Sequence, residues 1–340
     1  MGAAHGPNRG SAFRISCVGH SRWRHASPPP QARISAGCAQ SAVGAAPMTV
    51  RAAKLGTVTT AHVANMEPAP AAWRVWPRAA LYREGWTWRL IDRAVTAGRL
   101  RRARRDAYLH GDVDAATFAA CRIGGQLACV SELARRGVFV LEANRLHVRV
   151  SETAGRLRCE GREVRIHWSG GGGRDAANVG LLDALRDAML CQPPVEAVAT
   201  LDSALHLGLV DEADLAEVFR RLPRRLQILR RLTDAAAEAW SESIMRLLLR
   251  KAGCHVQSQV RIPGVGRVDF LVDGWLIIEC DSEAHHGGWE KQRRDKRRDQ
   301  VAASLGYATY RPIAEDIFWH RDAVMAAVRG LCAMRAVVRP

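Results

Sequence analysis

From Arg267 to Asp281 the chain reads RVDFLVDGWLIIECD, two apolar runs separated by an Asp-Gly pair. An Asp-Gly pair between alternating hydrophobic residues is a strong signal for a β-hairpin. Alternation assigns one face of this hairpin to apolar side chains, namely Val268, Phe270, Val272, Leu276, Ile278 and Cys280. The other face then carries three acids, Asp269, Glu279 and Asp281, if the register of the strands allows it.

The loop of the hairpin decides whether these acids meet. A two-residue loop, Asp273-Gly274, would place Asp269 and Glu279 on opposite faces, because side chains alternate along a strand. A three-residue loop that begins at Val272, with Gly274 left-handed in a β-bulge, would make Glu279 the same-face diagonal neighbour of Asp269. We expect the bulged hairpin, because only that register builds a site.

Helices and another strand are predicted around the hairpin. Residues 234–250 have the apolar spacing of a helix that carries Glu242, and residues 256–262 alternate as a strand. Downstream, a helical stripe is expected to pack inward and to point one of its arginines at the acids; it consists of Arg294, Arg298, Val301 and Leu305. The pattern therefore predicts a helix, a strand, the hairpin and a further basic helix in this part of the chain.

Three carboxylates on one face beside a hydrophobic sheet need a counter-charge. Like charges this close repel each other, and burying them unpaired is costly. Mg²⁺ (or Mn²⁺) removes that penalty, because it prefers hard oxygen ligands and leaves room for a phosphate oxygen. A bound ion of this kind can activate water and neutralise charge at phosphorus. The acids are therefore candidates for a metal-dependent phosphodiester-hydrolysing site.

These residues resemble a known family. Glu242 on a helix, V-D-F around Asp269, I-I-E-C-D around Glu279 and a downstream His-His resemble the endonuclease-like domain of unknown function related to very-short-patch-repair nucleases. The likeness covers about residues 234–335 and includes the arginine–aspartate repeat that ends at Asp299. That family belongs to the PD-(D/E)XK superfamily, so the resemblance implies a restriction-endonuclease-like mixed sheet flanked by helices over residues 234–340.

The resemblance implies a role for each acid. Asp269 and Glu279 would be the metal ligands, and Glu242 would be a supporting acid. His285 would handle a proton or associate with the metal. The sequence departs from the family at the lysine of the general motif, where Asp281 stands; a lysine that has moved would have to be Lys291 or Lys296.

The N-terminal half predicts a DNA reader. Two short helices near residues 79–83 and 88–95 precede a basic strand over residues 100–108, the order of a winged helix-turn-helix. The candidate phosphate contacts in this strand and in the downstream helix are Arg101, Arg102, Arg104, Arg105, Arg294 and Arg298. Residues 73–230 resemble, loosely, the N-terminal part of abortive-infection type IV antitoxins, although Asp106 stands where a glycine is usual. We expect further helices over 115–136 and 181–221, and a hairpin over 138–150.

Composition limits the alternatives. The net charge of +16 suits a polyanion, but only four of the 50 basic residues are lysine, and a GC-rich coding sequence produces the same arginine bias. Nine scattered cysteines without a CxxC pair or metal-knuckle spacing predict reduced thiols in a cytoplasmic protein. Residues 1–66 contain no acid, and we expect a disordered leader. Such a leader resembles a transit peptide, or it reflects a mis-assigned start codon before Met48 or Met66.

The sequence thus predicts an α/β protein in four parts. These are a leader (1–66), a winged-helix domain (67–150), an α/β connecting region (151–233) and an endonuclease-like domain (234–340). The first functional hypothesis is a metal-dependent DNA endonuclease with an attached DNA reader. The alternative is a non-catalytic DNA-binding regulator or antitoxin with a degenerate nuclease domain. The expected partner is DNA and not a membrane; a toxin or repair partner stays unidentified.

Overall fold

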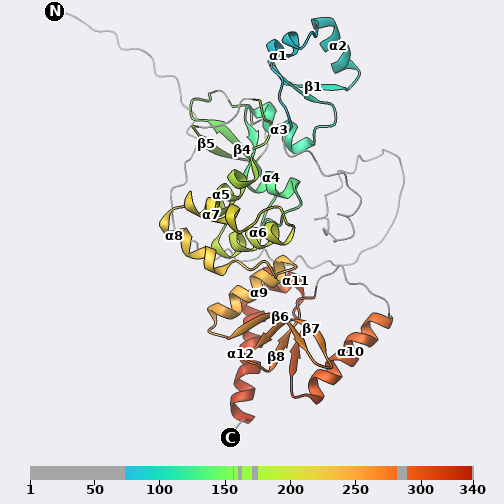
Figure 1. Ribbon diagram of the computed structural model, residues 1–340, viewed down its shortest axis with the longest axis vertical. Coiled ribbons are helices and arrows are strands. Elements are labelled where there is room, and N and C mark those ends of the chain that lie inside the picture. The colour runs from blue at the N-terminus through green and yellow to red at the C-terminus, as the bar shows by residue number, and fades with distance from the viewer. Residues whose placement is uncertain (1–72, 156, 160–162, 171–174, 282–288, 339–340) are drawn as a thin grey trace, which may run out of the picture. The chain divides into compact units, whose positions relative to one another are not determined.

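The part of the chain that the structure describes contains three β-sheets. The computed structural model describes residues 73–155, 157–159, 163–170, 175–281 and 289–338. The predicted leader and His285 lie outside these ranges. Among the described residues, no helix has both the length and the apolar character needed to cross a membrane. The protein is of the α/β class, with mixed sheets and helices (Figure 1).

Two short helices and a hairpin form the first described part. They are α1 (Arg78–Arg83), α2 (Trp88–Thr96), β1 (Leu100–Arg104) and β2 (Ala107–His110). The predicted single strand over residues 100–108 is wrong, because the chain turns at Arg105-Asp106 and the two strands pair antiparallel. Asp106 also has a local role, since its carboxylate accepts a hydrogen bond of 2.6 Å from the backbone N–H of Arg78, at the start of α1.

The second sheet combines antiparallel and parallel pairing. Its strands are β3 (Gln126–Leu127), β4 (Leu146–Ser151) and β5 (Val164–Ser169), in that spatial order. β3 pairs antiparallel with β4, whereas β4 pairs parallel with β5. The helix predicted over 115–136 is two helices, α3 (Ala115–Ile123) and α4 (Cys129–Arg135). Gly124, with a φ of 112°, ends α3 in the left-handed conformation that glycine tolerates best.

The hairpin predicted over residues 138–150 does not form. Residues 138–141 have no strand partner, and helices provide their contacts. The Phe139 N–H donates to Ser203 Oγ at 3.0 Å, and the Phe139 ring stacks on Trp240 with centroids 5.2 Å apart. The Leu141 N–H donates to the Gln192 side chain. Side chains from neighbouring helices thus satisfy backbone groups that a sheet would otherwise have satisfied.

A helical layer follows the second sheet. It consists of α5 (Leu181–Cys191), α6 (Pro194–His206), α7 (Glu212–Arg220), α8 (Arg224–Gln227) and the 3₁₀ helix η2 (Ile228–Leu232). Apolar faces of these helices join α4 in one buried core that includes Leu133, Leu185 and Leu201. Pro194 occupies the first position of α6, where its missing N–H costs no hydrogen bond, so the helical stretch is interrupted there as expected.

The third sheet carries the predicted acids. Its strands are β6 (Val256–Ile262), β7 (Gly266–Val272), β8 (Leu276–Ile278) and β9 (Ala308–Tyr310), in that order. The first three run antiparallel, and β9 pairs parallel with β8. One core joins this sheet to α9 (Trp240–Lys251), α11 (Ala314–Trp319) and α12 (Arg321–Val338), and a smaller core joins it to α10 (Trp289–Ser304). Helices therefore contact both faces (Figure 1).

The helix predicted from residue 234 begins six residues later, at Trp240. The preceding residues are held by side chains instead of by helical hydrogen bonds. The Asp234 N–H donates to the Asp202 carboxylate at 2.8 Å, and the Asp234 carboxylate accepts from Ser258 Oγ at 3.2 Å. Aspartate favours such local bonds over a helix interior, which explains the later start.

Candidate functional site

The strands of the third sheet bring four polar side chains into one row. Ser258 pairs with Phe270 and Val260 pairs with Val268, so Gln259 lies opposite Asp269. Phe270 pairs with Ile278, and one further step in this register places Glu279 opposite Asp269. Ile278 pairs with Tyr310 on β9, and the next step places Arg311 beside Glu279. The row across the sheet is therefore Gln259, Asp269, Glu279 and Arg311.

The register that brings Asp269 and Glu279 together differs from both registers considered above. Val272 pairs with Leu276, so the loop is Asp273-Gly274-Trp275. Asp273 and Gly274 have φ angles of 49° and 71°, as in a type I′ turn, and the Trp275 N–H donates to the Val272 carbonyl at 3.1 Å. Trp275 is therefore the extra residue. The loop has three residues with Gly274 left-handed, as predicted, but it begins at Asp273 and not at Val272, so the bulge lies at Trp275 and not at Gly274. The Trp275 carbonyl accepts a hydrogen bond from Ala308 of β9, which holds the bulge in place.

Two acids at the centre of the row, the half-buried Asp269 and the buried Glu279, have different partners. One carboxylate oxygen of Asp269 accepts a hydrogen bond of 2.8 Å from the backbone N–H of Cys280. Glu279 is only 9% exposed, and two arginines hold its carboxylate. Arg298 of α10 donates to Glu279 Oε1 at 2.9 Å, and Arg311 contacts Glu279 Oε2. Of the two arginines expected to point at the acids, Arg294 and Arg298, it is Arg298 that does so.

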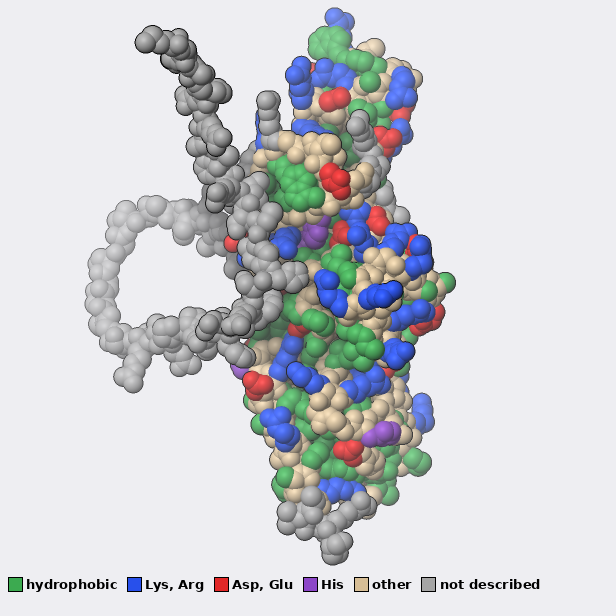
Figure 2. Space-filling view, turned by 90° about the vertical axis from the view of Figure 1, so that its left-hand side faces the viewer, with side chains coloured by type: hydrophobic (Ala, Val, Ile, Leu, Met, Phe, Trp, Pro, Cys, Tyr) green, Lys and Arg blue, Asp and Glu red, His purple; other side chains and the backbone are tan. Residues whose placement is uncertain are grey.

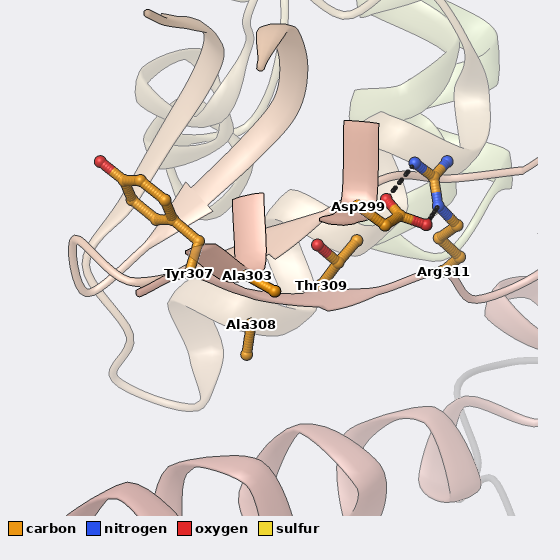
Figure 3. Close-up of a pocket in the computed structure, with 6 residues that line it drawn as sticks. All are labelled: Asp299, Ala303, Tyr307, Ala308, Thr309 and Arg311. Atoms are coloured by element: carbon orange, nitrogen blue, oxygen red, sulfur yellow. Dashed lines mark hydrogen bonds and ion pairs between the residues drawn. The ribbon is translucent and has the colours of Figure 1, made fainter. Parts of the chain in front are cut away.

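Arg298 and Arg311 are themselves anchored. Arg298 also donates to the backbone carbonyls of Val265 at 3.0 Å and Arg267 at 2.7 Å. Arg311 forms an ion pair of 2.9 Å with Asp299 of α10. Figure 3 shows Arg311 and Asp299 facing each other at one end of a hollow that also has Tyr307 and Thr309 in its lining. The two guanidinium groups are thus fixed charges at the site.

Glu242 reaches the row from the start of α9. It is 7% exposed, and its Oε2 accepts hydrogen bonds from the Glu238 N–H at 3.1 Å and from Gln259 Nε2 at 2.9 Å. Gln259 has a φ of 54°, a conformation that costs free energy for a residue with a side chain. Its amide oxygen is buried and has no hydrogen-bond partner among the described residues. A strained glutamine with an unpartnered oxygen beside two acids indicates a place for a ligand.

Burial and mutual repulsion shift the acids toward their neutral forms. Burial, followed by the charge of Asp269, raises the pKa of Glu242 to about 7. Burial also raises the pKa of Asp269, against the hydrogen bond from Cys280. Burial raises the pKa of Glu279 although Arg311 and Arg298 lower it. Carboxyl groups that resist ionisation in this way are typical of sites where a cation or a proton transfer completes the charge balance.

The other predicted residues lie further from the centre. Asp281 has a side chain 51% exposed, and its nearest ion-pair contact is Arg311 at 3.6 Å. Arg294 and Lys296 are exposed on α10, and the residue of that helix that reaches Glu279 is Arg298. The predicted inward stripe is only partly right, because its apolar members are exposed, and among the described side chains of α10 the buried one is Ala302.

The arginines of the first hairpin differ in their contacts, and of the four candidates only Arg101 is half-buried. Arg101 donates to the Val113 carbonyl at 3.0 Å and stacks on the Phe118 ring, 3.8 Å from its centroid. Arg102 donates to backbone carbonyls of its own turn. Arg104 and Arg105 are exposed. On the face in Figure 2, basic side chains lie among apolar ones over the whole visible surface and do not gather over one element.

A second group of polar side chains, which the sequence did not predict, lies in the middle region, by which we mean the described residues from α4 to α5. Cys129, His147, His167 and Cys191 each offer one ligand atom, and these atoms lie within 4.8 Å of one another. This Cys/His cluster can hold a metal ion. The four residues are 18 or more positions apart along the chain, so no local motif indicates them. Arg311 and Gln259 were missed as site residues for a similar reason, since only strand register places them beside the acids.

Comparisons with known proteins add nothing to this assignment, since no protein-family model and no curated protein matches the chain.

Proposed function

We propose that the C-terminal part, residues 234–340, is a metal-dependent endonuclease that hydrolyses phosphodiester bonds in DNA. The observation that carries the proposal is the row in which Asp269 lies opposite Glu279, with Glu242 beside them and two arginines fixed on Glu279. Such a set combines oxygen ligands, a titratable group and positive charge at one place. These are the components that phosphodiester hydrolysis requires.

The donor set fits Mg²⁺ or Mn²⁺. Asp269 and Glu279 would hold the ion, and the unpartnered amide oxygen of Gln259 is a further hard donor. The raised pKa values of Asp269 and Glu279 support this, because a divalent cation would offset the cost of ionising them. When bound, the ion would supply an activated water and neutralise charge on the phosphate.

Residues of the chain would supply the remaining chemistry. Glu242, with its pKa raised to about 7 by burial, can accept or release a proton near neutral pH. Arg311 and Arg298 would provide the positive charge that the family's lysine provides elsewhere, because Asp281 cannot do so. His285 remains the candidate for protonating the leaving oxygen. The first described part, with exposed Arg104 and Arg105, would position the protein on the DNA backbone.

One observation favours a second function. Both carboxylate oxygens of Glu279 are engaged by arginines, Oε1 by Arg298 and Oε2 by Arg311. A metal would have to compete with these charge-assisted bonds. If Arg298 and Arg311 keep Glu279 from binding a metal, the domain has a nuclease-like sheet without activity, and the protein is a DNA-binding regulator.

A plasmid-nicking assay separates the two functions. Supercoiled plasmid is incubated with the full chain and Mg²⁺ or Mn²⁺, and with EDTA as the metal-free control. We expect metal-dependent nicking that Glu279→Ala and Asp269→Asn abolish, because either change removes a ligand while the basic surface remains. Glu315→Ala, an exposed glutamate on α11, is the matched control and should nick like the wild type. DNA binding without nicking under any metal condition would reject the endonuclease in favour of the regulator.

A further inference from the structure

The Cys/His cluster (Cys129, His147, His167 and Cys191) lies where two strands and two helices of the middle region meet. Cys129 is the first residue of α4, His147 is on β4, His167 is on β5, and Cys191 is the last residue of α5. Its side chains come from four elements that span 63 positions of sequence. A common ligand for them would therefore connect the whole middle region.

Strand register explains how the two histidines meet. β4 and β5 are parallel, with His147 paired with Arg165 and Arg149 paired with His167. Side chains two positions apart on a strand share a face, so His147 and His167 are diagonal neighbours on the same side of the sheet. The alternate residues Val148 and Val150 belong to the separate apolar core on α3. The histidines thus face α5, and their nearest ring nitrogens, His147 Nδ1 and His167 Nε2, are 3.1 Å apart.

The two cysteines approach from the helices above this face. Cys191 Sγ is 3.8 Å from His147 Nδ1. Cys129 is fully buried, and its φ of 52° is a left-handed conformation that a residue with a side chain rarely adopts. α5 also contacts the same face through Arg149, which forms ion pairs of 2.7 Å with Asp183 and 2.6 Å with Asp187. The end of α5 is therefore fixed over the histidines by charge pairs next to the cluster.

Two of the six separations between the ligand atoms are close to those expected for tetrahedral zinc. With Zn–N of about 2.0 Å and Zn–S of about 2.3 Å, a regular tetrahedron places its ligand atoms about 3.3 to 3.8 Å apart. The two measured separations, 3.1 and 3.8 Å, fall close to these values, and every pair lies within 4.8 Å. Two thiolates and two imidazoles form a donor set that selects zinc, whereas hard cations such as Mg²⁺ prefer oxygen.

We propose that the Cys/His cluster binds one Zn²⁺ ion in a closed, four-ligand structural site. Four protein ligands leave no position for substrate, and His147 is only 7% exposed. The ion would clamp α4 and α5 to the sheet made by β4 and β5. The sheet has a first strand of only two residues, Gln126–Leu127, so such a cross-link adds stability that the strand pairing alone supplies poorly.

The first test is the metal content of the full chain, purified without added metal or chelator and measured by mass spectrometry of the elements. We expect one zinc per chain, retained by the double variant Asp269→Asn/Glu279→Gln. That control separates this site from the carboxylate site, so the proposal stands or falls independently of nuclease activity. Removing zinc with a chelator should lower the melting temperature, and adding Zn²⁺ should restore it.

Variants then assign the ligands. Cys191→Ser and His167→Gln should each lose the zinc, whereas Cys254→Ser, at a half-buried cysteine of the third sheet's core, should keep it. If the ligand variants fail to fold, Co²⁺ titration of the zinc-depleted wild type replaces them. It should produce the visible absorption of tetrahedral cobalt together with a thiolate-to-cobalt charge-transfer band.

Three results would overturn the proposal. The first is a wild type that carries no zinc and gives no tetrahedral cobalt spectrum. The second is full zinc content in both ligand variants. The third is a disulfide between Cys129 and Cys191 in protein kept under reducing conditions, detected by peptide mapping, because a disulfide would remove both sulfur ligands.

Discussion

Replacing Glu242 by glutamine should stabilise the protein, and the gain should grow with pH. Glu242 is buried, and burial with the neighbouring Asp269 charge raises its pKa from 4.5 to about 7 in the folded state. An acid whose pKa is raised by folding binds more protons in the folded than in the unfolded protein between these two values. The free energy of unfolding therefore falls as pH rises through that window, and the full cost is present above about pH 7.

The size of the effect follows from the same two pKa values. A difference between 4.5 and about 7 corresponds to a cost on the order of 3 kcal/mol at about pH 8. At about pH 5.5 only part of the interval between the two pKa values lies below the pH of the solution, so the cost of keeping Glu242 buried is on the order of 1 kcal/mol. Glutamine removes the charge but keeps an oxygen that can accept the hydrogen bonds from the Glu238 N–H and from Gln259. The variant should therefore gain about 2 kcal/mol more at the higher pH than at the lower one.

Urea denaturation of wild type and Glu242→Gln at both pH values measures this gain. The difference between the two proteins is the relevant quantity, because other groups that titrate in the window, such as Asp202 with its pKa raised by burial to about 6, are the same in both. Glu315→Gln, at an exposed position, is the matched control and should show no pH-dependent gain. Equal unfolding free energies for wild type and Glu242→Gln at both pH values would refute the reasoning, as would a gain at the lower pH alone.

Two further predictions concern stability and DNA binding. Asp202→Ala should destabilise the protein by about 3–5 kcal/mol in urea denaturation, because Arg246, whose side chain is 1% exposed, would lose its 2.8 Å partner; the double variant Asp202→Ala/Arg246→Met should recover part of the loss. DNA affinity should fall steeply with salt, and Arg104→Ala/Arg105→Ala should reduce the slope of log K against log salt by about 2 if both contact phosphates, measured by fluorescence anisotropy. An affinity that is indifferent to salt would assign the arginine excess to codon bias.

The strands of the third sheet could be predicted because each has its own local signal. Apolar and polar residues alternate over residues 256–262, and the Asp-Gly pair indicates the hairpin. The register could not be predicted, because it depends on Trp275. This residue is displaced into a bulge while its ring lies 4.6 Å from the Arg335 guanidinium of α12 and its carbonyl bonds Ala308. Those partners follow it by more than 30 positions, beyond the reach of a turn rule.

Where local and tertiary preferences conflict, the sequence pattern misleads. Val138–Leu141 has strand composition, but Val138 is buried in the helical core and Phe139 stacks on Trp240. The Cys/His cluster gave no signal at all, because its ligands are separated by whole elements of structure. Asp269 and Glu279 were identifiable because acids at those positions interrupt apolar strands, which is a local feature. Their basic partner Arg311 directly follows β9, which the chain reaches only after α10.

The two candidate functions differ in what Glu279 binds. In the present arrangement its charge is balanced by Arg298 and Arg311, so the buried carboxylate is already compensated without a cation. The carboxyl groups of Glu242 and Asp269 are not compensated in this way. Glu242 has no ion-pair partner among the described residues, and its pKa is about 7. A cation would therefore gain most by binding between Asp269 and Gln259 and drawing Glu279 away from one guanidinium. Arg311 has Asp299 as an alternative partner at 2.9 Å, whereas Arg298 is held by backbone carbonyls. The released arginine would accordingly be Arg311, which keeps its ion pair with Asp299 and also lies 3.6 Å from Asp281.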